Sequence, residues 1–103
     1  MRIMKFIIPE LLKYNTDAPI CIVSNPCDIM TAVAAKIAGP YVPPGRIFGS
    51  GTCLDTSRLR SLIGDTLNVD TRNVHGYIIG EHGDSSTAVW SGVNVGGVPL
   101  LEQ

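Results

Sequence analysis

A short apolar run, a helical segment and a second short strand candidate constrain the fold of this chain more than any other feature. Residues 20–23 are continuously apolar and end at the turn residues 24–26, which is typical of a buried parallel strand. Residues 28–38 have a helical pattern that stops at a Gly-Pro pair, and residues 46–49 predict another strand. Because two strands joined by a helical crossover run parallel, the sequence predicts an α/β fold.

The segment before the first strand also has a helical pattern. Residues 2–14 predict a helix in which five apolar side chains share one side: Ile3, Phe6, Ile7, Leu11 and Tyr14. Pro9 lies within this segment and lacks the N–H that a helix interior uses. We therefore expect Pro9 to kink the helix or to shift its start.

The second half of the chain predicts a helix followed by a hairpin. The helix covers residues 54–67, and Thr52 with Asp55 three residues later resembles a capping box at its start. Residues 77–79 and 87–90 predict two strands around a polar turn. The Gly-rich residues 93–100 give no clear assignment.

Composition excludes several classes of function. The 103 residues carry a formal net charge of −1, which argues against a broad nucleic-acid surface and against attraction to anionic membranes. No stretch is long and apolar enough to span a bilayer. The 3 cysteines form no CxxC pair, so we expect buried, reduced thiols in a cytoplasmic protein. With only 2 histidines, no metal-ligand spacing is present.

Two charged residues fall on the apolar face of the predicted helix 54–67. Asp55 and Arg58 share the side defined by four aliphatic residues: Leu54, Leu59, Leu62 and Ile63. Inward charges are costly unless they are paired or used. A structural ion pair between Asp55 and Arg58 at i+3 is an equal alternative to a functional site.

His82 lies in the polar turn that follows the strand 77–79. A histidine whose one ring nitrogen is oriented by an acid can exchange a proton at the other nitrogen. Asp55 could supply that acid across the fold, or Asp84 could supply it locally, and the spacing leaves both open. The alternative is a histidine that is only hydrogen-bonded within its turn.

Two polar residues follow the predicted parallel strands. Asn25 lies at the carboxyl end of the first strand, where ligands of open α/β sheets bind, although Asn-Pro is also a common turn signal. Ser50 lies between two glycines after the second strand and is either a ligand contact or an ordinary loop hydroxyl. No GxGxxG dinucleotide fingerprint occurs in the sequence.

Three ordered motifs, residues 23–28, 49–60 and 80–85, together closely resemble the L-lactate dehydrogenase family, with bacterial members nearest. Glu81 before His82 favours that family over its malate dehydrogenase relatives. The resemblance implies NAD-dependent interconversion of L-lactate and pyruvate. It also implies a homo-oligomer, and the charge argument above gives no expectation of a nucleic-acid or membrane partner.

The resemblance assigns roles to the residues of the predicted reaction site. His82 would be the proton donor and acceptor, and Asp55 would orient and stabilise it. Arg58 would bind the substrate carboxylate with two parallel hydrogen bonds. Asn25 would contact the substrate and help to place the nicotinamide.

The resemblance also implies contacts with other ligands. Val23, Ser24 and Ser50 lie where the family contacts NAD. Arg60 and His75 match positions at which allosteric bacterial members bind fructose 1,6-bisphosphate, and ordinary exposed charge is the alternative for both.

The family match implies an internal piece of a larger enzyme. Residues 1–50 would be the end of a Rossmann-type parallel-sheet, dinucleotide-binding domain, and residues 51–103 would begin the α+β substrate domain. The alternatives are a non-catalytic incomplete chain and a piece of a malate or other 2-hydroxyacid dehydrogenase.

Overall fold

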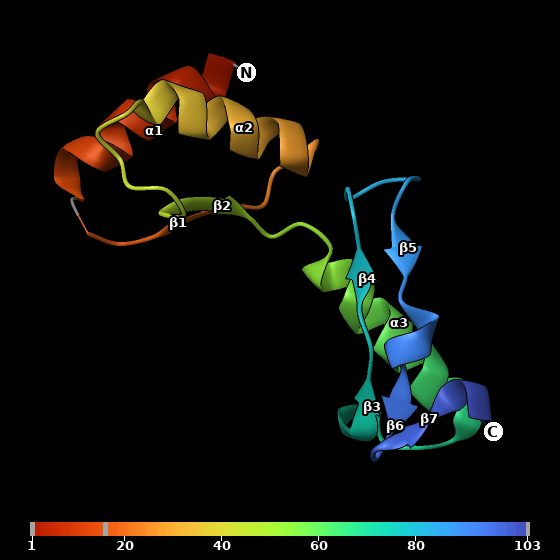
Figure 1. Ribbon diagram of the computed structural model, residues 1–103. Helices are drawn as coiled ribbons and strands as arrows, with labels where there is room; N and C mark the ends of the chain where they lie inside the picture. The colour runs from red at the N-terminus through yellow and green to blue at the C-terminus, as the bar shows by residue number, and fades with distance from the viewer. Residues whose placement is uncertain (1, 16, 103) are drawn as a thin grey trace. The chain divides into compact units, whose positions relative to one another are not determined.

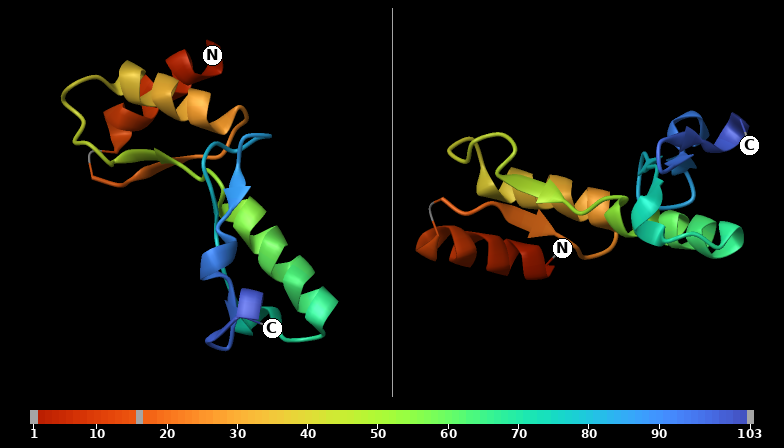
Figure 2. Two further views of the ribbon diagram at one scale, coloured as in Figure 1. Left: turned by 45° about the vertical axis from the view of Figure 1, so that its right-hand side comes forward. Right: turned by 90° about the horizontal axis from the view of Figure 1, so that it is seen from below.

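A computed structural model describes residues 2–15 and 17–102. The chain divides into two compact units, Met1–Gly51 and Thr52–Gln103. Figures 1 and 2 show the elements of each unit, and each unit is described by itself.

The first unit is a parallel two-stranded ribbon with two helices on one of its faces (Figures 1 and 2). In chain order its elements are α1 (Arg2–Tyr14), β1 (Ile20–Ile22), α2 (Cys27–Ala38) and β2 (Ile47–Gly49). β1 and β2 pair in parallel, with Ile20 opposite Ile47 and Ile22 opposite Gly49. The predicted strand–helix–strand unit with parallel strands is therefore confirmed.

The core of the first unit corrects the predicted buried face of α1. Ile8 is only 1% exposed, whereas Phe6 of the predicted face is 72% exposed. The buried line instead runs through Met4 and Ile8 toward Leu12, against Ile22 and Ala34. Apolar residues surround the first turns of α1, so periodicity alone could not choose the face that packs on α2 and the ribbon.

Pro9 does not have the predicted effect on the ends of α1. The helix starts at Arg2 and continues through Pro9 to Tyr14. Pro9 is exposed, so its ring lies away from the core.

The second unit packs one helix against short antiparallel strands. Its regular elements are α3 (Cys53–Leu67), β3 (Val74–His75), β4 (Ile78–Ile79), β5 (Thr87–Ala88), β6 (Asn94–Val95) and β7 (Val98–Pro99). The pairing of β4 with β5 confirms the predicted hairpin, but Trp90 belongs to a short 3-10 helix rather than to the strand. The sheet β3-β6-β7, which includes the unassigned Gly-rich segment, was not predicted.

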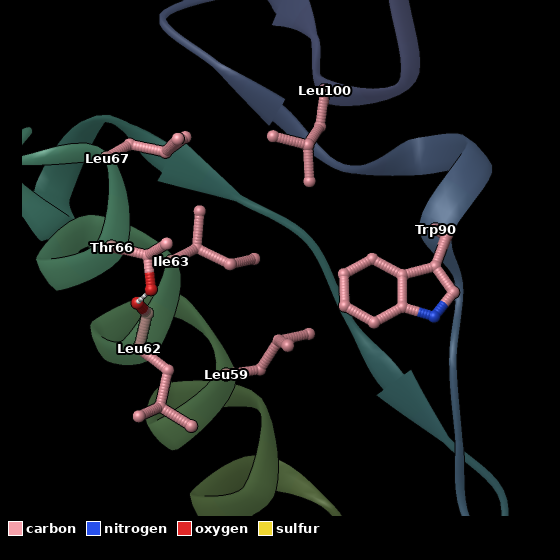
Figure 3. Close-up of a pocket in the computed structure, with 7 residues that line it drawn as sticks. All are labelled: Leu59, Leu62, Ile63, Thr66, Leu67, Trp90 and Leu100. Carbon is pink, nitrogen blue, oxygen red and sulfur yellow. Dashed lines mark hydrogen bonds between the residues drawn. The ribbon is translucent and has the colours of Figure 1, made fainter. Parts of the chain in front are cut away.

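The core of the second unit contains Ile63, Val74 and Val93. Beside it, an apolar cavity of about 300 Å³ lies along the later turns of α3, with Trp90 and Leu100 on its other side (Figure 3). The residues that line this cavity include none of the predicted site residues.

Candidate active site

His82 and Asp55 are in direct contact within the second unit. His82 Nδ1 lies 2.7 Å from Asp55 Oδ2. The side chains are 29% and 20% exposed, so solvent reaches both only in part. Of the two carboxylates that the sequence offered as partners, Asp55 makes this contact, and Asp84 is exposed in the turn.

The contact joins two elements that the sequence places far apart. Asp55 lies in the first turn of α3, where a carboxylate is favoured by the helix dipole. His82 lies in the turn between β4 and β5. Gly80, with φ of 97°, adopts the backbone conformation that begins this turn and that residues with a Cβ rarely adopt.

The predicted capping box at the start of α3 is wrong. Thr52 is the N-cap, but its side chain makes no capping hydrogen bond. Thr52 Oγ1 instead donates to the carbonyl oxygen of Ile78 in β4, at 2.7 Å. The hydroxyl thus links the start of α3 to β4 and does not cap the backbone N–H groups of α3.

The predicted inward position of Arg58 is also wrong. Arg58 is exposed and, among residues 2–15 and 17–102, takes part in no ion pair. The packed side of α3 is instead defined by Thr56, Ile63 and Gly64. The alternative of an i+3 ion pair between Asp55 and Arg58 is therefore absent from this part of the chain.

Arg60, for which ordinary exposed charge was the alternative, packs against the neighbouring strands. Its Nε donates to the carbonyl oxygen of Gly76 at 3.0 Å, and its guanidinium carbon lies 5.0 Å from the centre of the Tyr77 ring. His75 is exposed on β3 and pairs with Asn94 of β6. Arg60 is thus held by a hydrogen bond and an aromatic ring and is not an ordinary exposed charge. His75 is exposed, as the alternative for that residue expects.

Four other predicted site residues gather at one edge of the first unit. Val23, Ser24 and Asn25 follow β1 directly and are exposed. Ser50 follows β2, and its N–H donates to the carbonyl oxygen of Ile22 at 2.9 Å. Because β1 and β2 are parallel, these residues share the carboxyl edge of the ribbon, where open α/β sheets bind ligands.

The cysteines follow the predicted burial only in part. Cys27 is buried at the start of α2, where its Sγ lies 3.4 Å from the carbonyl oxygen of Ile22. Cys21 and Cys53 are exposed, against expectation. All three are free thiols. Cys21 alternates with the buried Ile22 along β1, so it points to the ribbon's other face.

The residues that the structure describes, 2–15 and 17–102, contain neither a membrane-spanning helix nor a cluster of metal ligands. None of their helices has the length and apolar character needed to cross a membrane. Within the same residues, no group of three or more His, Cys, Asp or Glu side chains is placed to hold a metal ion.

Comparison with known families matches both units. Residues 1–49 match the NAD binding domain of lactate/malate dehydrogenase, and residues 52–103 match the alpha/beta C-terminal domain of the same family. The chain belongs to the lactate/malate dehydrogenase family. Membership agrees with the α/β fold, and the His82–Asp55 contact lies in the part that matches the C-terminal domain.

Individual family members are similar over nearly the whole chain. The L-lactate dehydrogenase A chain of Xenopus laevis is 56% identical over 100 residues, covering 97% of this chain and 29% of its own length. The A chain of Lycodichthys dearborni is 54% identical, with coverages of 97% and 30%, and the B chain of Sceloporus woodi is 52% identical over 102 residues, with coverages of 99% and 30%. The chain thus spans less than a third of each relative. These relatives are vertebrate proteins and lend no support to the expected closeness to bacterial members.

Sequence reasoning missed the role of two threonines beside the His–Asp contact. Thr52 and Thr56 both hydrogen-bond to Ile78. They lie at i and i+4 on one side of α3, flanking Asp55, which is a pattern that could have drawn attention to them.

Proposed function

We propose that the protein to which this chain belongs interconverts L-lactate and pyruvate with NAD as the redox cofactor. The observation that carries the proposal is the 2.7 Å contact between His82 Nδ1 and Asp55 Oδ2. It supports an acid–base role because the carboxylate fixes the ring orientation and stabilises the imidazolium when His82 is protonated.

His82 would move the proton of the reaction at Nε2. Since Asp55 contacts Nδ1, the substrate hydroxyl would give its proton to Nε2 during lactate oxidation. In pyruvate reduction the same nitrogen would return a proton to the carbonyl oxygen. NAD, when bound, would supply the hydride acceptor or donor.

Arg58 and Asn25 would hold the substrate. The exposed guanidinium of Arg58 can give a carboxylate two parallel hydrogen bonds, and it lies one turn after Asp55 on α3. Asn25 offers both an amide donor and an amide acceptor at the carboxyl edge of the ribbon. A guanidinium that binds one carboxylate suits a 2-oxo or 2-hydroxy acid.

The residues at that carboxyl edge fit the nicotinamide half of NAD. Val23 offers an apolar contact, and Ser24, Asn25 and Ser50 offer groups that can bond to an amide and to ribose hydroxyls. We infer that residues 1–50 end a dinucleotide-binding domain and that residues 51–103 begin the substrate domain. The match of residues 1–49 to an NAD binding domain supports the first assignment.

The location, oligomeric state, metabolic role and regulatory ligand that we propose are properties of the whole protein. We infer a cytoplasmic homotetramer that acts in glycolysis and pyruvate fermentation, from the family to which the chain belongs. Fructose 1,6-bisphosphate would contact Arg60 and His75. The bond of Arg60 Nε to Gly76 leaves its terminal guanidinium nitrogens for a phosphate.

A chimera tests the proposal. This chain would replace the 100 matching residues of the Xenopus laevis L-lactate dehydrogenase A chain. We expect a folded chimera that oxidises NADH with pyruvate, and loss of turnover in its His82→Gln variant with NADH binding retained. A folded chimera that binds NADH but turns over neither pyruvate nor lactate would contradict the proposal. Preference for oxaloacetate over pyruvate would favour a malate dehydrogenase.

The isolated chain provides a second test of the proposed function. We expect no measurable turnover and weak or no NADH binding from the 103 residues, because they contain no Gly-rich phosphate-binding turn. NADH fluorescence titration and a pyruvate assay measure both properties. Robust turnover by the chain alone would show that the nicotinamide can be oriented for hydride transfer without a Gly-rich phosphate-binding turn.

A further inference from the structure

We propose that Thr56, assisted by Thr52, is a positioning residue for the His82–Asp55 pair. The hydroxyls of both threonines hold the backbone of Ile78, and this attachment fixes where the turn that carries His82 lies relative to α3. The inference rests on the proposed function for its catalytic meaning, but its structural part can be tested without any turnover.

Thr56 is a buried polar residue that makes two bonds to one distant residue. It is 7% exposed. Its Oγ1 accepts from the N–H of Ile78 at 3.0 Å and donates to the carbonyl oxygen of Ile78 at 3.4 Å, across 22 positions of sequence. Thr52 Oγ1 donates to the same carbonyl oxygen at 2.7 Å. A buried hydroxyl with this arrangement is costly to remove, because the N–H of Ile78 would then lose its acceptor while its carbonyl oxygen kept only the bond from Thr52.

Ile78 depends on the threonines because its backbone faces away from β5. The neighbouring residue Tyr77 accepts from the N–H of Val89, on the side of the hairpin. Alternate residues of an antiparallel strand direct their N–H and C=O groups to opposite edges, so those of Ile78 point out of the hairpin toward α3. The two hydroxyls thus pair the N–H and C=O groups of Ile78, which lie on the open edge of β4 and would otherwise need another strand as a partner.

The attachment lies close in sequence to both members of the pair. Thr56 directly follows Asp55, and Ile78 precedes His82 by four residues, with Gly80 making the turn between them. A shift of β4 along α3 would therefore move His82 relative to Asp55. A 2.7 Å contact between two partly exposed side chains needs this kind of backbone restraint to persist.

The test replaces the hydroxyl of Thr56 by a methyl group of similar size. In the full chain, long-range ¹⁵N–¹H spectra of neutral His82 report which ring nitrogen carries the proton. We expect the Nδ1–H form to predominate in the original chain and to lose that predominance in Thr56→Val. Thr56→Ser keeps the hydroxyl and should restore the original spectrum.

Thr66→Val is the matched control on the same helix. Thr66 is exposed, and its Oγ1 donates within α3 to the carbonyl oxygen of Leu62 at 2.7 Å. We expect no change at His82 in this variant. In the chimera, Thr56→Val should lower kcat by up to about a hundredfold while the KM for pyruvate stays unchanged, because the shift misplaces the proton-transfer group and not the carboxylate anchor.

The outcomes separate this inference from the proposed function. A folded Thr56→Val chain with an unchanged His82 spectrum would overturn the positioning role. If Thr56→Val unfolds the second unit, Thr52→Val, which removes one bond to Ile78, carries the test with the same expected change. Unfolding of both variants would make the threonines purely structural and would also overturn the inference. A changed His82 spectrum together with an inactive original chimera would leave the positioning role standing and remove the lactate dehydrogenase proposal.

Discussion

His82 Nδ1 lies 2.7 Å from Asp55 Oδ2, although the two residues are 27 positions apart in the sequence. The contact brings the turn after β4 onto the first turn of α3. An imidazole that is oriented through Nδ1 would exchange a proton with a substrate at Nε2.

Removing either member of this pair should produce effects that do not add. We expect His82→Gln to lower kcat of the chimera by about 10²–10⁴-fold, the usual contribution of general acid–base catalysis. Asp55→Asn should lower kcat as well, but it should add little when His82 is already Gln, since Asp55 acts through the imidazole. Steady-state kinetics of the two single variants and the double variant measure this coupling. Fully additive losses would mean that Asp55 acts on something other than His82.

Arg58→Lys should impair pyruvate use far more than its retained charge suggests. The planar guanidinium can give a carboxylate two parallel bonds, whereas an ammonium offers a point charge. Loss of this geometry should cost about 1.5–3 kcal/mol in kcat/KM, the scale of charge-assisted bonds. Arg72→Lys is the control, because Arg72 is an exposed arginine of the same unit that pairs with Asp70. Near-normal efficiency of Arg58→Lys would remove Arg58 from the substrate site.

The buried face of α1 can be tested by stability. Ile8→Ala should lower the free energy of unfolding of the first unit by about 2–5 kcal/mol, because it opens a cavity in the core. Phe6→Ala should change it by less than about 0.5 kcal/mol, since that side chain is exposed. Urea titration of the chain, followed through the methyl resonance of Ala34, measures both. A larger loss for Phe6→Ala would restore the face that periodicity predicted.

The exposed pair of Asp70 and Arg72 predicts one acid-dependent effect. The Arg72 side chain, and then its backbone N–H, donate to the Asp70 carboxylate and lower its pKa, against a smaller opposing effect of burial. The side-chain bond also raises the pKa of Arg72, which stays charged throughout. Because the carboxyl pKa is lower in the folded state, its contribution to stability is present above the unfolded-state pKa and is lost as the pH falls through the folded-state value.

A carboxyl titration measures this effect directly. Arg72→Gln should move the pKa of Asp70 upward, toward its ordinary value, whereas Arg58→Gln should leave it in place. The effect on stability at neutral pH should be small because both side chains are well exposed to solvent. An unchanged Asp70 titration in Arg72→Gln would show that the pair does not persist in solution.

Local sequence signals determined most of the elements. Gly39-Pro40 ends α2 as predicted, and the predicted strand segments 20–23 and 46–49 contain the parallel strands β1 and β2. These signals act within a few residues, through chain stiffness, missing N–H groups and side-chain period. The segment 93–100 gave no such signal, because β6 and β7 are two residues long and are defined by their pairing with β3 rather than by their own pattern.

The ordered motifs also determined the family and the candidate residues His82, Asp55 and Arg58. Only the tertiary structure decided that Asp55 rather than Asp84 meets His82, that Ile8 rather than Phe6 is buried, and that Arg60 rather than Arg58 packs inward. Each of these choices depends on groups far away in the sequence: the β1–β2 ribbon for α1, and the backbone of Ile78 and Gly76 for α3. A helix with apolar or polar residues on several sides has no intrinsic inner face, and the partners that it meets in three dimensions select one.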